Sequence, residues 1–152
     1  MYVILFKDMF LWVIFMEINI YVQGRKFDKD YIYAFNEYSK RISPWASLKL
    51  NICKSLPFFS DKRGTMSYIV LPGAHTLSSP RLAKEINRQN LMGISRIDYY
   101  IPEEISTLPL SADNASIFNL STFCMGRELT FVVLAEQLYR AYTINNNITY
   151  HK

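Results

Sequence analysis

The chain has 152 residues, of which 50% are apolar and 15% aromatic, so it is long and apolar enough for one domain with a sizeable core, and disorder is excluded. Its formal net charge of +4 suits a phosphate-rich partner, but the 17 Lys and Arg residues form no run of four, and on charge alone a solvated basic surface is the simpler explanation. Cys53 and Cys124 lie in apolar runs without a CxxC or a zinc spacing, which predicts no metal site and reduced, buried thiols in a cytoplasmic protein.

The first fifteen residues, MYVILFKDMFLWVIF, are strongly apolar. Lys7 and Asp8 split this run into pieces far shorter than the roughly 20 residues of a membrane-spanning helix. No small-residue cleavage site of a signal peptide follows. We interpret 1–15 as an N-terminal extension upstream of the true start; a segment that covers an interface or touches a membrane is the alternative. One domain is predicted over 16–152.

Hydrophobic periodicity predicts the elements of the first half. Residues 18–22 alternate as a strand, and 28–42 follow a helical period with Asp28 as the cap. A second strand is predicted at 48–52 and a third at 66–71. The connection 55–65 is rich in turn formers and is predicted to be a loop.

The second half continues the alternation of helices and strands. Ser79 as N-cap and Pro80 at the first position begin a helix that Gly93 ends. A fourth strand is predicted at 96–101, a polar helix or turn at 104–118, a fifth strand at 120–125 and a last helix at 129–144. This order predicts an α/β domain with a mainly parallel sheet and helices on both faces. Ligands then bind beyond the carboxyl ends of the strands, at turns 72–73, 102–104 and 125–128.

The last helix is apolar on two adjoining stripes, wider than packing on one sheet requires. The stripes consist of Phe131, Leu134, Leu138 and Ala141, and of Val132, Ala135, Tyr139 and Tyr142. We therefore expect a second cover over this helix, and a second subunit is the simplest candidate.

The end of the chain, AEQLYRAYTINNNITYHK, carries a specific motif: Glu136, then LYRA at 138–141, a polar stretch, and YHK at 150–152. With the opening INIYVQG at 18–24 and Gly73 before the second helix, it resembles the RlmH family of SPOUT-class methyltransferases over about 16–152. That family transfers methyl from S-adenosylmethionine to N3 of a pseudouridine in large-subunit ribosomal RNA.

The resemblance implies a C-terminal trefoil knot, a homodimer packed through the C-terminal helix, ribosomal RNA or the ribosome as partner, a cytoplasmic location and no membrane contact. It implies that knot loops hold the donor and that the partner's C-terminus reaches toward it. The residues it assigns to S-adenosylmethionine are Ile69, Gly73, Ile101, Pro102, Glu103, Phe123, Cys124, Met125, Gly126 and Arg127.

Three departures from the family pattern support a second hypothesis. Where the family has a Gly-Gly-Pro-Glu-Gly type loop, this chain has Tyr100 to Glu104, and larger side chains would crowd the donor. Residues 125–127 replace a Leu-Pro-His stretch, and 55–65 lacks a family helix. The alternative is therefore a degraded knotted dimer that binds RNA or a protein partner without methyl transfer.

Three C-terminal residues are candidates for catalysis. His151 has a pKa suited to take a proton from N3, or it hydrogen-bonds a backbone carbonyl. Arg140 pairs with a phosphate or the donor's carboxylate, or forms an intersubunit salt bridge to Glu136 or Glu103. Tyr150 stacks on a base or seals the interface. Arg127 has two candidate ligands as well, the donor and RNA.

Overall fold

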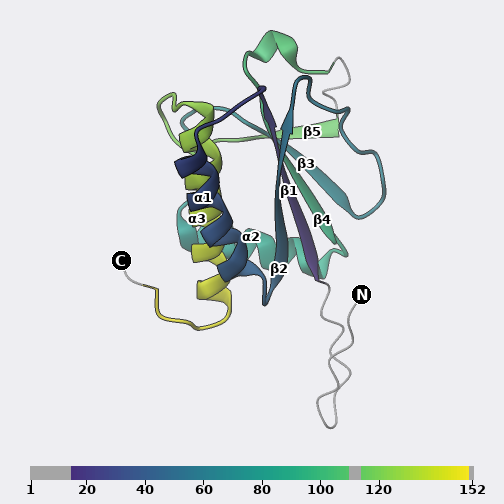
Figure 1. Ribbon diagram of the computed structural model, residues 1–152. Helices are drawn as coiled ribbons and strands as arrows, with labels where there is room; N and C mark the ends of the chain where they lie inside the picture. The colour runs from purple at the N-terminus through teal and green to yellow at the C-terminus, as the bar shows by residue number, and fades with distance from the viewer. Residues whose placement is uncertain (1–14, 110–113, 151–152) are drawn as a thin grey trace.

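The computed structural model describes residues 15–109 and 114–150 as a single sheet with helices packed against it (Figure 1). The elements of the described residues are, in chain order, β1 (Met16–Gln23), α1 (Lys29–Ile42), β2 (Ala46–Cys53), β3 (Thr65–Val70), α2 (Ser79–Leu91), β4 (Arg96–Ile101), the short 3-10 helix η1 (Ile105–Thr107), β5 (Ala115–Phe118) and α3 (Arg127–Asn145).

The five strands form one sheet in the order β2-β1-β4-β3-β5, and every pair is parallel. Ile20 of β1 lies opposite Leu50 of β2 and Tyr99 of β4. The parallel sheet predicted from the alternation of elements is therefore confirmed.

The prediction of helices on both faces is wrong for the described residues, because α1, α2 and α3 all contribute to one core against one face of the sheet. The strand order explains this. The connections β1-α1-β2 and β3-α2-β4 step in the same direction across the sheet, and right-handed crossovers that step the same way place their helices on the same face. The connections from β2 to β3 and from β4 to β5 step the other way and cross the opposite face.

The core on the helical face includes aliphatic residues of β1 and β4 together with one side of each helix. Helix α3 packs against both α1 and α2. Phe131 of α3 is fully buried and meets Phe27 and Phe35 edge-on, at 5.8 and 6.0 Å between ring centroids. The second cover expected over α3 is thus supplied in large part by helices of the same chain.

The opposite face is covered by irregular segments. Leu56 and Phe59, from the connection between β2 and β3, pack on Ile69 and Tyr100, and Leu108 lies beside them. Phe59 meets the Tyr100 ring edge-on at 4.7 Å. The predicted loop is confirmed, since residues 54–64, all of which the structure describes, contain no helix.

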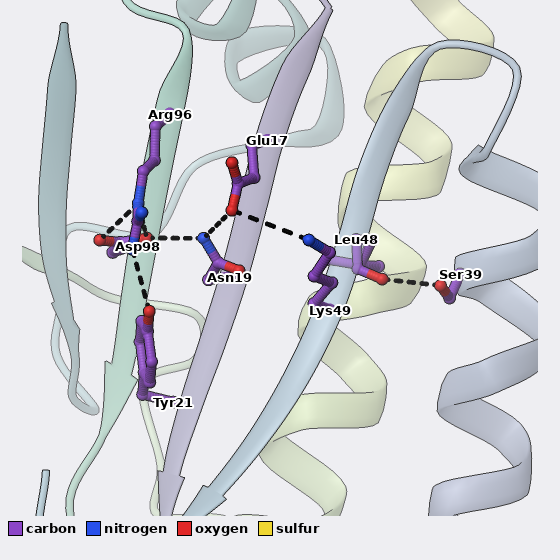
Figure 2. A network of polar contacts seen from close by, with 8 residues as sticks. All are labelled: Glu17, Asn19, Tyr21, Ser39, Leu48, Lys49, Arg96 and Asp98. Atoms are coloured by element: carbon purple, nitrogen blue, oxygen red, sulfur yellow. Dashed lines mark hydrogen bonds and ion pairs between the residues drawn. The ribbon is translucent and has the colours of Figure 1, made fainter. Parts of the chain in front are cut away.

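A polar cluster occupies the amino-terminal half of this same face (Figure 2). Asp98, which is 1% exposed, accepts two hydrogen bonds from Arg96 Nε, at 2.9 and 3.1 Å, and one from Asn19 Nδ2 at 3.0 Å. Arg96 Nη2 donates to the hydroxyl of Tyr21, and Asn19 also donates to Glu17. The cluster therefore links β1 to β4 through side chains as well as through the backbone.

Three local predictions were wrong. The fifth strand is 115–118, whereas all of the predicted 120–125 is loop. The N-cap of α2 is Ser78, one residue before the predicted Ser79. Cys124 is exposed, although Cys53 is half-buried. Asn147, in the asparagine run just after α3, adopts a φ of 53°, a left-handed conformation that asparagine tolerates better than most residues.

Candidate functional site

A cleft of about 330 Å³ opens beyond the carboxyl ends of β3 and β4, the edge at which parallel sheets bind ligands. Its volume lies at the lower end of the range for small-molecule sites. Three segments form its walls: one follows β3, one follows β4 and one leads from β5 into α3. The lining residues are Val70, Leu71, Pro72, Ile101, Pro102, Glu103, Glu104, Ile105, Leu120, Ser121, Phe123, Cys124, Met125, Arg127 and Thr130.

Two of these segments are tied together side by side. The amides of Leu71 and Gly73 donate to the carbonyls of Phe118 and Ser121, at 3.1 and 2.9 Å. The Asn119 side chain donates to the Leu71 carbonyl at 3.0 Å and accepts from the His75 amide at 3.2 Å. The loops after β3 and β5 are therefore joined to each other where they border the cleft.

Gly73 is required by this close approach. A Cβ atom added there would lie 2.5 Å from Oδ1 of Asn119, far inside van der Waals contact. The residue thus has a packing role that the sequence did not indicate.

Arg127 begins α3 and is held by groups of its own chain. Its Nη1 donates to the carbonyl of Gln23, its Nη2 pairs with Glu103 Oε1 at 3.2 Å, and its guanidinium lies 5.6 Å from the Phe27 ring centroid. The guanidinium thereby connects β1, the loop after β4 and α3. A ligand that binds the Arg127 guanidinium would therefore have to share it with Gln23, Glu103 and Phe27.

The charges of the cleft come from Glu103, Glu104 and Arg127, while most of the remaining walls are apolar. Carboxylates accept hydrogen bonds from hydroxyl and ammonium groups, and apolar walls fit an aromatic ring. The site therefore suits a small molecule that combines a flat ring with hydroxyl and cationic groups.

Of the ten residues predicted to hold the donor, seven line this cleft: Ile101, Pro102, Glu103, Phe123, Cys124, Met125 and Arg127. Gly73 and Gly126 belong to the bordering loops but are not in the lining. Ile69 lies on the opposite face of the sheet, in the cluster with Leu56 and Phe59. Ile69 is therefore separated from the other nine.

Tyr100 was expected to crowd the donor loop, but its side chain points away from the cleft. It is 1% exposed and stacks on Tyr21 at 5.2 Å on the far face of the sheet. The residues that replace glycines and do border the cleft are Ile101 and Glu104.

Pro72 and Glu104 fall in the turns predicted to bind ligands, whereas sequence reasoning missed the lining residues Val70, Leu71, Ile105, Leu120, Ser121 and Thr130. Val70 and Leu71 could have been found from the rule that strand ends bind ligands, because the end of β3 was predicted to within one residue. The residues around Leu120 could not, because they were assigned to a strand.

The C-terminal candidates form a separate group at the other end of α3. Arg140 Nε and Nη2 donate to Glu136 Oε1 at 3.0 and 2.6 Å, and the guanidinium lies 5.2 Å from the Tyr150 ring centroid. This is the predicted salt bridge to Glu136, but within one chain. Burial first, then a hydrogen bond with Tyr38, raises the pKa of Tyr150 to about 12.

The two groups are not brought together within one chain. Arg140 follows Arg127 by thirteen residues of one helix, a rise of about 20 Å at 1.5 Å per residue. An apolar hollow of about 570 Å³ adjoins the C-terminal group, lined by Ser79, Pro80, Arg140, Thr143, Ile144, Ile148, Thr149 and Tyr150. His151 lies outside the described residues.

No helix within residues 15–109 and 114–150 has the length and apolarity to cross a bilayer. Among the same residues, no group of three or more His, Cys, Asp or Glu side chains is placed to hold a metal ion.

Comparison with known proteins gives one consistent result. The family described as predicted SPOUT methyltransferase matches residues 16–151. A protein of Thermoanaerobacter sp. (strain X514) named ribosomal RNA large subunit methyltransferase H 1 is 35% identical over 140 residues, covering 90% of this chain and 100% of the relative. Proteins named ribosomal RNA large subunit methyltransferase H from Mycoplasmopsis synoviae (strain 53) and Clostridioides difficile (strain 630) are each 29% identical, with the same coverage.

Proposed function

This chain belongs to the RlmH family of SPOUT methyltransferases, and from that membership we propose that it transfers a methyl group from S-adenosylmethionine to large-subunit ribosomal RNA. The observation that carries the proposal is the cleft at the ends of β3 and β4, in which seven of the ten predicted donor residues gather. The names of the three relatives described above state methyl transfer to large-subunit ribosomal RNA, and the donor is part of our proposal. We further propose N3 of a pseudouridine as the acceptor.

The residues present fit the donor. The apolar wall of Ile101, Leu120 and Met125 suits the adenine ring, and Glu103 and Glu104 can accept hydrogen bonds from ribose hydroxyls or the amino group. When bound, S-adenosylmethionine supplies an electrophilic methyl group on a sulfonium. The task of the chain is then to align the acceptor nitrogen with that methyl group, and alignment can lower a barrier by about 7–11 kcal/mol.

We propose that the C-terminal group acts on a cleft of the partner subunit. Within one chain Arg140 and Tyr150 lie far from the cleft, and the apolar hollow beside them is a surface that a second copy would cover. In this homodimer His151 takes the proton that leaves N3, Arg140 binds a phosphate or the donor's carboxylate, and Tyr150 stacks on a base. The paired loops 71–76 and 118–121 fit the proposed trefoil knot.

Calorimetric titration of the full chain with S-adenosylmethionine tests the proposal. We expect saturable binding, which Cys124→Trp weakens at least about tenfold because an indole at this exposed lining position fills the cleft. Leu91→Trp is the matched control, because Leu91 is 90% exposed and lies outside the cleft. Absence of binding at a millimolar concentration of S-adenosylmethionine would contradict the proposed enzyme activity. It would favour the alternative of a dimer that binds RNA or a protein partner without methyl transfer.

A further inference from the structure

Gln23, the last residue of β1, holds the loop after β4 from outside the cleft. Its side chain is 7% exposed and does not belong to the lining. The Oε1 atom accepts the backbone N–H of Glu103 at 3.0 Å and lies 2.6 Å from the hydroxyl of Thr107, whose single proton it shares with the Glu104 carbonyl, also at 2.6 Å. One buried oxygen thus fixes two points of the segment that supplies Pro102, Glu103 and Ile105 to the cleft.

The other polar groups of Gln23 connect further segments. Nε2 donates to the carbonyl of Lys54 at 3.4 Å, at the start of the connection between β2 and β3. The backbone carbonyl accepts from Arg127 Nη1, and Arg127 in turn pairs with Glu103. Gln23 therefore joins the loops after β2 and β4 and the start of α3.

The chemistry of the position favours this holding role over simple packing. A buried amide is costly unless its oxygen and nitrogen are hydrogen-bonded, and here the partners of the oxygen both belong to the loop. The backbone N–H of Glu103 would lose its side-chain acceptor if Gln23 were apolar. Two hydrogen bonds to one loop also restrict its backbone, which contains no glycine between Tyr100 and Leu108.

We propose that Gln23 is a positioning residue of the donor site, which presets residues 102–107 in the shape that binds the donor. The inference rests on the proposed function for its ligand, while the hydrogen bonds that carry it are properties of the chain alone. Gln23 does not touch the ligand and acts through Glu103 and Thr107.

The test compares Gln23→Leu with Gln23→Glu in the full chain. Gln23→Leu removes both acceptor contacts, and its Kd for S-adenosylmethionine is expected to rise about tenfold, because the loop is no longer held in the shape that binds the donor. Gln23→Glu retains an oxygen for both donors but loses the Nε2 bond to the Lys54 carbonyl, so its Kd is expected to rise less than that of Gln23→Leu. Asn87→Ala, which removes a hydrogen bond between α2 and α3 away from the cleft, should leave the Kd unchanged.

A second measurement separates this inference from the proposed function. Hydrogen exchange at the Glu103 amide is expected to be faster in Gln23→Leu than in the wild type, with or without donor. If the wild type binds no donor, the proposed function fails and this exchange rate still decides the role of Gln23. An unchanged exchange rate, or a Gln23→Leu protein that binds donor as the wild type does, overturns the inference.

Thr107→Val serves if Gln23→Leu fails to fold. It removes one of the two donors to Gln23 Oε1 and keeps the glutamine. The Kd is then expected to rise about threefold, because one hydrogen bond of the pair remains. A Thr107→Val protein that folds and shows an unchanged Kd and unchanged Glu103 exchange would also overturn the inference.

Discussion

Gly73 lies where the loop after β3 passes the side chain of Asn119. In Gly73→Ala the new methyl group would lie 2.5 Å from Oδ1 of Asn119, so Asn119 must move and release its hydrogen bonds to the Leu71 carbonyl and the His75 amide. We expect the free energy of unfolding in urea to fall by about 1–3 kcal/mol, as for other overpacked sites.

Gly126 provides the matched control for that substitution. A Cβ there meets nothing within 4 Å, and the residue is the N-cap of α3, a position at which serine is favoured. Gly126→Ser should leave the free energy of unfolding unchanged or raise it slightly. Equal stability of Gly73→Ala and the wild type would show that Asn119 can move aside without cost.

At the scale of elements, the carboxyl-terminal half of α3 carries the prediction about assembly. Ile148, which is 46% exposed, lines the apolar hollow with Pro80 and Ile144. If a second copy covers this hollow, Ile148→Asp buries an unpaired charge, and sedimentation velocity should show a shift from dimer to monomer. Leu91→Asp changes an apolar residue that is exposed elsewhere and should leave the dimer intact.

Two results would contradict the proposed interface. A wild-type chain that sediments as a monomer at high micromolar concentration has no such dimer. An Ile148→Asp protein that sediments as a dimer would place the interface on another surface.

The elements also show what periodicity can and cannot predict. β4 was predicted with the bounds it has, because 96–101 alternates between the two faces, Gly93 ends the preceding helix and Pro102 follows the strand directly. β5 was misplaced because it is a four-residue edge strand with Ile117 exposed, so its position depends on pairing with β3 rather than on a local pattern.

Periodicity also could not predict the face of the sheet on which each helix packs. An amphipathic pattern shows that a helix has a buried side, but the face of the sheet depends on the spatial order of the strands. For the site, the rule about strand ends found the right edge of the sheet. Whether Ile69 and Tyr100 point to the helical face of the sheet or to the opposite face depends on the strand register. The register depends on pairing between strands, so it cannot be predicted from one segment alone.

At the scale of the whole molecule, buried tyrosines predict how stability depends on pH. Burial raises the pKa of Tyr100 to about 12, and burial followed by a hydrogen bond with Tyr38 does the same for Tyr150; burial also raises the pKa of Tyr99 and Tyr142. The folded state therefore favours the neutral phenol, and this contribution is complete below pH 10. It is lost as pH rises from 10 through 12, because the unfolded chain ionises first.

Urea unfolding between pH 9 and pH 12 measures this loss. The free energy of unfolding of the wild type is expected to decline as pH rises. That of Tyr100→Phe should decline less steeply, because this variant lacks one phenol with a raised pKa. Tyr33→Phe is the control, because Tyr33 is 67% exposed. Parallel declines for wild type and Tyr100→Phe would contradict the expectation.

The polar cluster of β1 and β4 has a consequence for how the sheet assembles. Parallel neighbours have no hairpin turn to align them, and Asn19 and Asp98 are separated by 79 positions along the chain. A slip by one residue would turn Asp98 into the apolar core, and a slip by two would keep the faces correct but move its carboxylate away from Asn19. The hydrogen bonds to the buried Asp98 carboxylate therefore favour the native register of β1 and β4. They disfavour shifted pairings that the hydrophobic pattern alone would allow.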